Sequence, residues 1–196
     1  MEHDDIETLR LGGQSALSQQ FSVYRERLER MIEFRLDARL RGRIDPEDVL
    51  QETWIDAARR LPDYLATPQV SLYVWLRQLT YQSLINIQRR HFGQKRDPRQ
   101  EFTLPQQHAD ATSYSIAACL LGQHTSPSEA LLRQEEWDRL QSVLSSMDPT
   151  DREVLALRHF EQLGNNQVAE VLGISVTAAS NRYVRALQRL SEFMSS

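Results

Sequence analysis

Asn165 to Leu190 reads NNQVAEVLGISVTAASNRYVRALQRL, and this stretch decides the fold. Its first part carries apolar residues at the spacing of one helix face and ends at Leu172. Gly173 follows, and glycine takes the left-handed conformation that ends a helix at no steric cost. Ser175 is suited to cap a second helix by accepting a hydrogen bond from a free backbone N–H group. Two helices joined by so short a corner form a helix-turn-helix.

The second helix of this pair has one apolar and one polar face. Six apolar residues recur at helical spacing and are expected to point inward: Val176, Ala179, Tyr183, Ala186, Leu187 and Leu190. The polar face holds Thr177, Asn181, Arg182 and Arg185. Asparagine and arginine bond to base edges in the major groove of DNA, so this pattern favours a DNA reader. The alternative interpretation is an αα-hairpin in an ordinary helical bundle.

The composition limits what the rest of the chain can be. Its 196 residues suffice for one large domain or two small ones. The formal net charge is −4, so contact with phosphate requires local basic patches. Cys119 is the one cysteine, which excludes an internal disulfide framework and a zinc site built from several cysteines. Because the histidines also lack metal-ligand spacing, we expect neither a metal nor a cofactor.

The N-terminus gives no sign of export. Its first ten residues, MEHDDIETLR, are acidic and lack an apolar run, so we expect no signal peptide. No stretch approaches the roughly 18 apolar residues that a membrane-spanning helix needs. The expectation is a protein of the cytoplasm without membrane insertion.

Amphipathic segments with a period of 3.6 residues dominate the chain, and alternating β-branched runs are absent, which predicts an all-α fold. A first helix is expected from about Ser15 to Leu40. Three later helices are predicted where a capping residue precedes proline at the first helical position: Asp45-Pro46, Ser126-Pro127 and Asp148-Pro149.

The segment 98–125 differs from its surroundings. It contains Pro98, Pro105 and Gly122 and has weak periodicity, although Ile116 to Leu121 could form a short helix. We interpret it as a linker between two small helical domains, at residues 1–97 and 126–196.

An acidic stretch opens the second predicted helix, with the sequence DPEDVLQETWID from Asp45 to Asp56. Asp48, Glu52 and Asp56 follow one another at intervals of four residues and therefore share a face. Three interpretations remain open for this face. It is a solvated surface, a docking surface for a basic partner, or part of a carboxylate cluster for a divalent metal in a helical hydrolase.

The stretch from Val74 to Arg99 is basic instead. Six Lys and Arg residues face one acid, and Trp75, Tyr81 and Phe92 lie among them. Cations interleaved with aromatic rings suit a nucleic-acid strand whose bases are unstacked. The alternatives are core packing for Trp75 and a solvated helix C-terminus for the cations, which the helix dipole favours there.

Two basic helices behind one acidic helix resemble the extracytoplasmic-function class of bacterial RNA polymerase sigma factors over nearly the whole chain. DPEDVLQETW, from Asp45 to Trp54, is similar to the region-two helix that docks on the β′ clamp coiled coil. The segment from Leu72 to Arg90 is similar to the helix that melts and reads the minus-ten element. MDPTDREVL, from Met147 to Leu155, resembles the start of region four, and Asn165 to Leu190 resembles its reader of the minus-thirty-five element.

The resemblance implies a non-catalytic initiation subunit with a set of contact residues. For the upstream DNA element these are Thr177, Ser180, Asn181, Arg182 and Arg185. For the minus-ten element and melting they are Tyr64, Trp75, Arg77, Tyr81, Arg89, Arg90, Lys95 and Arg96, with 64–71 as the loop that captures a flipped base. For polymerase they are Asp45, Glu47, Asp48, Gln51 and Glu52. The implied partners are core RNA polymerase, through the β′ clamp coiled coil and the β flap, promoter DNA and, as a further candidate, an anti-sigma factor.

The sequence departs from the family at several points. Ser180 stands where the family often has lysine, and Asn181 where it often has serine. The 64–71 loop and the linker are long for the class, and the third domain of housekeeping sigma factors is absent. Two rivals share parts of the pattern. One is a stand-alone DNA-binding regulator, and the other is a sigma-like adaptor that binds an anti-sigma protein and no DNA.

Overall fold

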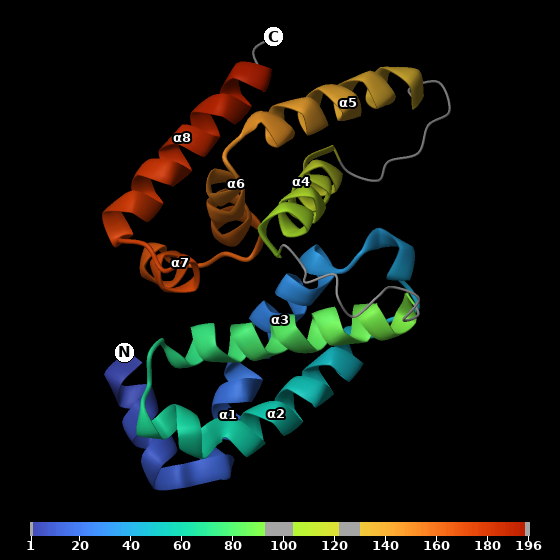
Figure 1. Ribbon diagram of the computed structural model, residues 1–196. Helices are drawn as coiled ribbons and strands as arrows, with labels where there is room; N and C mark the ends of the chain where they lie inside the picture. Colours follow the sequence, from blue (N-terminus) through green and yellow to red (C-terminus); the bar gives the residue numbers. More distant parts are fainter. Residues whose placement is uncertain (1, 93–103, 122–129, 195–196) are drawn as a thin grey trace. The chain divides into compact units, whose positions relative to one another are not determined.

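The computed structural model of the chain describes residues 2–92, 104–121 and 130–194. Within these ranges the regular elements are helices, so the all-α prediction is confirmed (Figure 1). They are α1 (Glu2–Arg35), a 3-10 turn (Ala38–Leu40), α2 (Pro46–Ala66), α3 (Leu72–His91), α4 (Leu104–Leu121), α5 (Ala130–Ser146), α6 (Pro149–Leu155), a π-helical turn (Ala156–Phe160), α7 (Asn165–Leu172) and α8 (Val176–Met194).

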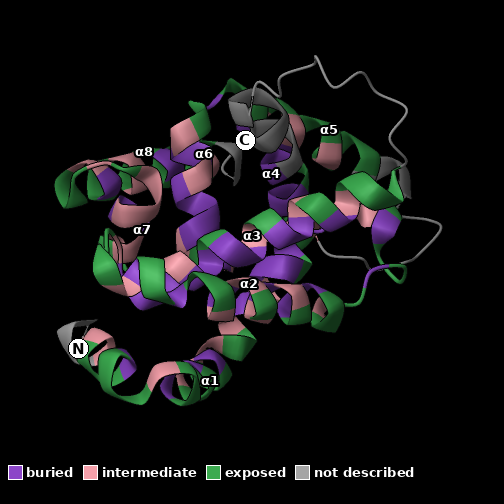
Figure 2. Ribbon diagram, turned by 60° about the horizontal axis from the view of Figure 1, so that its bottom comes forward, coloured by how far each residue is buried: buried purple, intermediate pink, exposed green. Residues whose placement is uncertain are grey.

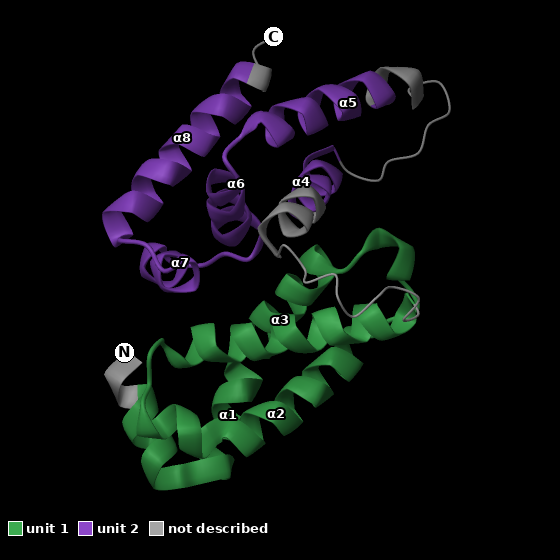
Figure 3. Cartoon of the chain, in the orientation of Figure 1, with its two compact units in different colours: residues 1–98 green, residues 99–196 purple. Residues whose placement is uncertain are grey.

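The chain forms two compact units, residues 1–98 and 99–196 (Figure 3). Unit 1 contains α1 to α3, and unit 2 contains α4 to α8. Each unit has its own buried apolar residues, and each is described by itself below.

The first helix is longer than its pattern predicts and is bent. It begins at Glu2 rather than near Ser15, and Gly13 interrupts it with non-helical dihedral angles (φ 53°, ψ −133°). Before this kink Leu9 is fully buried, and the guanidinium of Arg10 donates to the carbonyl of Leu65 at 3.2 Å. The helix stops at Arg35 rather than at Leu40. It stops there because Asp37 caps a separate 3-10 turn, with its carboxylate accepting from the N–H of Arg39.

Unit 1 is a three-helix bundle in which α1, α2 and α3 each pack on the other two. Helix α3 buries much of its first half, from Leu72 to Leu76 (Figure 2). Tyr73 lies at the centre of the bundle, and the guanidinium of Arg27 stacks over its ring at 3.7 Å from the centroid. The apolar stripes of the three helices thus meet in one core.

Unit 2 contains a helix where the sequence analysis placed a linker. Residues 104–121 form α4, which is longer than the short helix expected at 116–121 and packs on α5 and α6. Ile116 and Ala117 are fully buried, and Ser113 accepts a hydrogen bond from the guanidinium of Arg152 at 2.8 Å. The linker assignment of 98–125 is therefore wrong for this stretch. Its contact face consists of small and hydroxyl residues, which give little hydrophobic periodicity.

Two of the three predicted helix starts with a capping residue and proline are confirmed. Asp45 accepts from the N–H of Glu47 at 2.9 Å and precedes Pro46 at the start of α2. Asp148 accepts from the N–H of Thr150 at 2.8 Å and precedes Pro149 at the start of α6. The third start, Ser126-Pro127, lies outside the described residues.

The corner between α7 and α8 is built as its sequence predicts. Gly173 ends α7 in the left-handed conformation (φ 62°, ψ 33°). The hydroxyl of Ser175 accepts from the N–H of Ala178 at 3.1 Å and so caps α8. Because both ends of this turn satisfy local backbone requirements, the angle between the two helices is set by a few residues.

Gly173→Ala should therefore destabilise unit 2 by about 1 kcal/mol, the order of the cost of an L-residue in the left-handed region. A Cβ at this position meets no atom within 4 Å, so the cost comes from backbone strain and not from a clash. Urea unfolding of the full chain, followed by far-UV circular dichroism, measures it. Gly173→Asn is the control, because asparagine tolerates the left-handed region better than alanine does. Equal stability of the two variants would contradict this account of the corner.

Candidate functional site

Helix α8 presents an uncharged face to solvent. Five exposed residues that share one side of the helix line it: Thr177, Ser180, Asn181, Val184 and Gln188. The first three of these positions were predicted from the sequence, whereas Val184 and Gln188 were assigned to neither face. Helical spacing from Thr177 and Asn181 would have found both.

Two residues of the predicted apolar face of α8 are exposed, and two others, Tyr183 and Leu190, are half-buried. Val176 is 46% exposed and Leu187 is 36% exposed, whereas Ala179 and Ala186 are buried as predicted. Val176 is the first residue of its helix, where fewer neighbours surround a side chain. Leu187 lies at the wall of a cavity. The apolar stripe of α8 is therefore narrower than the sequence indicates.

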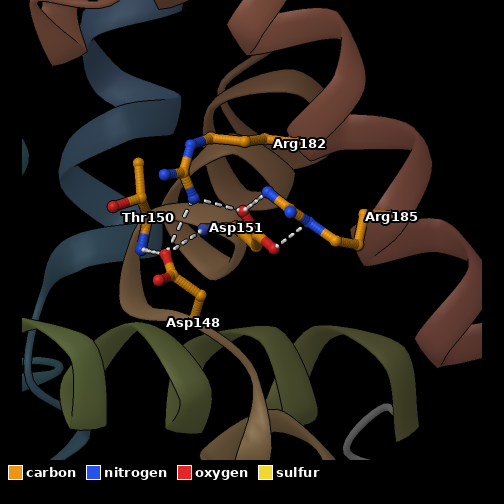
Figure 4. A network of polar contacts seen from close by, with 5 residues as sticks. All are labelled: Asp148, Thr150, Asp151, Arg182 and Arg185. Carbon is orange, nitrogen blue, oxygen red and sulfur yellow. Dashed lines mark hydrogen bonds and ion pairs between the residues drawn. The ribbon is translucent and has the colours of Figure 1, made fainter.

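The two arginines of α8 that were assigned to DNA turn toward α6 (Figure 4). Arg182 Nη1 lies 2.9 Å from Asp148 Oδ1 and 2.6 Å from Asp151 Oδ1. Arg185 Nε lies 2.7 Å from Asp151 Oδ2. The carboxylate of Asp151 is buried, and it pairs with two guanidinium groups from the neighbouring helix. Arg182 keeps only 28% of its side chain exposed, and Arg185 keeps 55%.

This network, which we call the Asp151 clamp (Asp148, Asp151, Arg182 and Arg185), shifts the pKa of two of its members. Burial acts to raise the pKa of Asp148, but the N–H of Thr150 and the charge of Arg182 outweigh it, so the pKa is lowered. The hydrogen bond to Asp151 raises the pKa of Arg182. Both shifts favour the charged form of the group, and the ion pairs of the clamp hold α8 against α6.

A second polar contact joins the two helices of the helix-turn-helix. The side-chain amide of Asn165, in α7, donates to the hydroxyl of Ser180 and to the carbonyl of Val176, at 2.9 Å each. Ser180 is exposed but already engaged on one side, so its position is set within the protein. Together with the Asp151 clamp, this contact holds α8 in one orientation.

Unit 2 also contains a cavity of about 700 Å³ with mostly apolar walls. Leu120 and Leu121 of α4 form one side, and Leu187 and Leu190 of α8 form another. Glu136, Arg139 and His159 add polar groups to its lining. A cavity of this size and composition suits an apolar side-chain cluster or a short helix of another protein.

On unit 1, the exposed face of α2 is less acidic than its sequence indicates. Arg25 pairs with Glu47, and Arg90 lies 2.5 Å from Glu52. Asp45 is occupied as the helix cap. Asp48 and Gln51 are exposed, and Asp48 makes no ion pair within the described part of the chain. Ile55 lies one to two turns further along this face and is 60% exposed.

The third acid of the predicted stripe also has partners. Asp56 lies 2.6 Å from Arg59 and 3.2 Å from Arg60. Over the described ranges, no group of three or more His, Cys, Asp and Glu residues is arranged to hold a metal ion. No helix in those ranges is long and apolar enough to cross a membrane.

The minus-ten residues predicted on unit 1 divide into buried and exposed ones. Tyr64 is buried and stacks on Trp75, with ring centroids 4.3 Å apart and planes 14° apart, while its hydroxyl donates to the carbonyl of Val70. Arg77 is buried and lies 6.0 Å from the ring of Tyr81, so it is placed to support the bundle. Arg89 and Arg90 are exposed, and Lys95 and Arg96 lie outside the described residues.

The exposed face of α3 contains amides that the sequence analysis did not select. Gln78, Gln82 and Asn86 are exposed at intervals of four residues, and Arg89 continues the row. The side-chain amide of Gln82 donates to Asn86 at 3.1 Å. Such groups offer both donors and acceptors, which charged residues do not. The prediction for this helix rested on cations and aromatic rings and therefore did not include these amides.

These features match a known sequence family. Residues 137–190, from α5 into α8, match the family described as Sigma-70, region 4. The RNA polymerase sigma factor CnrH of Cupriavidus metallidurans is 26% identical over 150 residues, which are 76% of this chain and 73% of CnrH. The RNA polymerase sigma factor YlaC of Bacillus subtilis is 24% identical over 148 residues, 76% of each chain.

The fold has a counterpart among solved structures. The structure of CnrH in complex with the cytosolic domain of CnrY aligns with 99% of this chain and 97% of that chain, at a TM-score of 0.53 and 21% identity. This likeness supports the all-α fold with its helix-turn-helix.

The helix-turn-helix unit carries the region-four signature of Sigma-70 proteins. Together with the two relatives, this match supports the resemblance to RNA polymerase sigma factors of the extracytoplasmic-function class that the motifs predicted. Sigma factors serve promoter-specific transcription initiation with RNA polymerase.

Asp151→Asn should lower the stability of unit 2 by about 2 kcal/mol, because hydrogen bonds to charged groups contribute about 1.5–3 kcal/mol and Asn cannot receive both guanidinium groups as an anion. Urea unfolding of the full chain measures the loss, and hydrogen exchange should show faster exchange in α6 and α8. Asp138→Asn is the control, because Asp138 is exposed and accepts only from Gln134 on its own helix. Unchanged exchange in α8 would show that the clamp does not hold it.

Proposed function

We propose that this protein binds core RNA polymerase and directs it to promoters by reading two DNA elements. In this proposal, unit 2 reads the minus-thirty-five element with α8, and unit 1 reads and opens the minus-ten element with α3 and the 64–71 loop. The observation that carries the proposal is the uncharged, exposed face of α8 within a helix-turn-helix of the region-four family. A helix with such a face is suited to the edges of bases in a major groove.

On the upstream element, base contacts and phosphate contacts fall to different residues. Thr177, Ser180 and Asn181 have short polar side chains on the exposed face and are the candidates for base edges. Arg185 keeps half of its side chain exposed while paired with Asp151, so it can reach a phosphate at the edge of the groove. Arg182 is more enclosed and serves chiefly to position the helix.

Docking on polymerase is assigned to α2. The side chains of Asp48 and Gln51 are exposed and make no side-chain hydrogen bond or ion pair within the described residues. Ile55 adds an exposed apolar side chain to the same face. The β′ clamp coiled coil is the expected partner of this face, and a basic partner surface would gain in orientation and association rate. The cavity of unit 2 suits an apolar helix, and the β flap is the expected partner there.

Capture of the minus-ten strand is assigned to the Tyr64–Trp75 stack and to the exposed row of α3. Tyr64 lies in the last turn of α2, and its stack on Trp75 holds that turn against α3. The hydrogen bond from its hydroxyl to the carbonyl of Val70 fixes the other end of the loop that follows α2. A base that leaves the duplex costs a few kcal/mol of stacking, which contacts with the loop must recover. Gln78, Gln82 and Asn86 can bond an unstacked strand beside Arg89.

Two further elements complete the proposal. Attachment to polymerase raises the effective concentration of both DNA contacts, so a protein with a net charge of −4 need not bind DNA tightly alone. Because CnrH has been solved in complex with the cytosolic domain of CnrY, a protein partner that withholds this chain from polymerase, an anti-sigma factor, is proposed as well. The site of action would be the cytoplasm.

Run-off transcription with core polymerase on a genomic fragment library tests this function. The expected result is transcription from a small set of fragments that share two elements with a constant spacing. Core binding without any specific transcript would overturn the proposal. DNA binding without core binding would instead support a stand-alone regulator, and binding of a protein inhibitor without DNA binding would support a sigma-like adaptor.

Asn181→Ala should relax the preference for one base pair of the upstream element by about 1–3 kcal/mol, as expected for one good base contact. Competition between promoters changed at single positions measures it. Asn166→Ala is the matched control, because Asn166 is exposed on α7 and not on the reading face of α8. If Asn181→Ala keeps the full preference at every position, Asn181 makes no base contact.

Charge reversal at the exposed acid of α2 should weaken the polymerase complex. Asp48→Arg together with Ile55→Ala is expected to reduce core binding by roughly tenfold or more, because it places a cation against the basic face of the partner. Co-purification and fluorescence anisotropy with core polymerase measure the affinity. Glu26→Arg, at an exposed acid of α1, is the control for net charge. Unchanged core affinity in the double variant would remove α2 from the docking surface.

A further inference from the structure

One apolar side chain lies at the centre of the reading face of α8. Val184 is 52% exposed, and its neighbours on the face are Asn181, one turn before it, and Gln188, one turn after it. Thr177 lies two turns before it on the same line. All three neighbours are polar and exposed. The core of unit 2 does not cover the outer part of this valine, so its methyl groups are available to a ligand that meets this face.

The surroundings of Val184 limit what that ligand can be. The charged residues nearest in the helix, Arg182 and Arg185, turn toward Asp151 and leave the face uncharged. The helix itself is held by the Asp151 clamp and by the bond between Asn165 and Ser180. Val184 is therefore an apolar spot of fixed position among hydrogen-bonding groups. Such a spot suits a small apolar group on a surface that is otherwise polar.

The floor of a DNA major groove offers one such group, the C5-methyl of thymine. Cytosine, adenine and guanine carry no methyl group there. We propose that Val184 is a specificity-determining residue that recognises a thymine methyl in the upstream element. This inference rests on the proposed function, because it needs α8 to lie in the major groove.

The geometry also gives the register of the contact. Val184 lies three positions after Asn181, a rise of about 4.5 Å along the helix. Neighbouring base pairs are about 3.4 Å apart along the duplex. The thymine contacted by Val184 thus lies in the base pair next to the one that Asn181 contacts, or in the partner strand of that step.

Replacement of thymine by deoxyuridine tests this contact, because it removes the methyl group and changes no hydrogen-bonding atom. The experiment uses the holoenzyme with core polymerase on a promoter obtained from the run-off selection, with each upstream thymine replaced singly. The expected result for the unchanged protein is a loss of roughly fourfold in affinity at one position, the order of burying one methyl group. For Val184→Ala that position should become insensitive to the replacement.

Two control variants separate the contact from general effects. Val184→Thr keeps one methyl group at the same place and should retain part of the deoxyuridine effect. Val23→Ala removes the same atoms from an exposed valine of α1 and should retain all of it. Binding of core polymerase alone by Val184→Ala should equal that of the unchanged protein.

Several results would overturn the inference, and they differ from failure of the function. If transcription is specific and Asn181→Ala changes base preference, but no deoxyuridine position matters, the function stands and the methyl contact does not. The same follows if Val184→Ala keeps the full deoxyuridine effect. If Val184→Ala loses core binding and keeps the methyl effect, Val184 contacts polymerase instead. Absence of any specific transcript removes both proposals together.

Discussion

The organisation of unit 2 depends on one buried carboxylate. Asp151 follows the cap of α6, and it receives guanidinium groups of Arg182 and Arg185 from α8. A buried acid without such partners is strongly unfavourable, so the two helices must meet at this point with little freedom. The orientation of α8, and with it the set of residues that face solvent, follows from this contact. The face of α8 that we propose for DNA is therefore fixed by contacts within the protein.

Several charges on the faces assigned to partners are paired within the chain. Arg25 and Arg90 neutralise acids of α2, as Asp151 neutralises arginines of α8. Beside exposed charges such as Asp48 and Arg89, these faces present uncharged groups: amides on α3, hydroxyl and amide groups on α8, and the apolar Ile55 and Val184. Uncharged groups discriminate by hydrogen-bond pattern and shape, whereas charges mainly increase affinity for any phosphate. Such surfaces fit the proposed role of a subunit that is held near DNA by RNA polymerase and needs little affinity for DNA of its own.

Much of the fold could be predicted from local signals. The starts of α2 and α6 followed from Asp-Pro pairs, and the corner after α7 followed from Gly173. Helix α4 could not be found in this way, since its buried face includes Thr112, Ser113 and Ser115 beside a few apolar residues, and the first two of these bond to α6. The contact residues assigned to α8 stay predictions. The structure adds two things that the motif did not contain: Val184 is exposed on the same face, and Arg182 is paired with a carboxylate of α6.

By itself, then, the sequence determined most of the elements and the resemblance to sigma factors, because caps, left-handed turns and helical periodicity act within a few residues along the chain. The tertiary structure alone decided which side chains remain available for a partner. Asp151 and Arg182 are 31 residues apart, and Glu52 and Arg90 are 38 apart. A pairing over such distances depends on how helices pack, and packing is a property of all the contacting faces at once. For that reason the same arginine reads as a DNA contact in the sequence and as a helix-positioning residue in the fold.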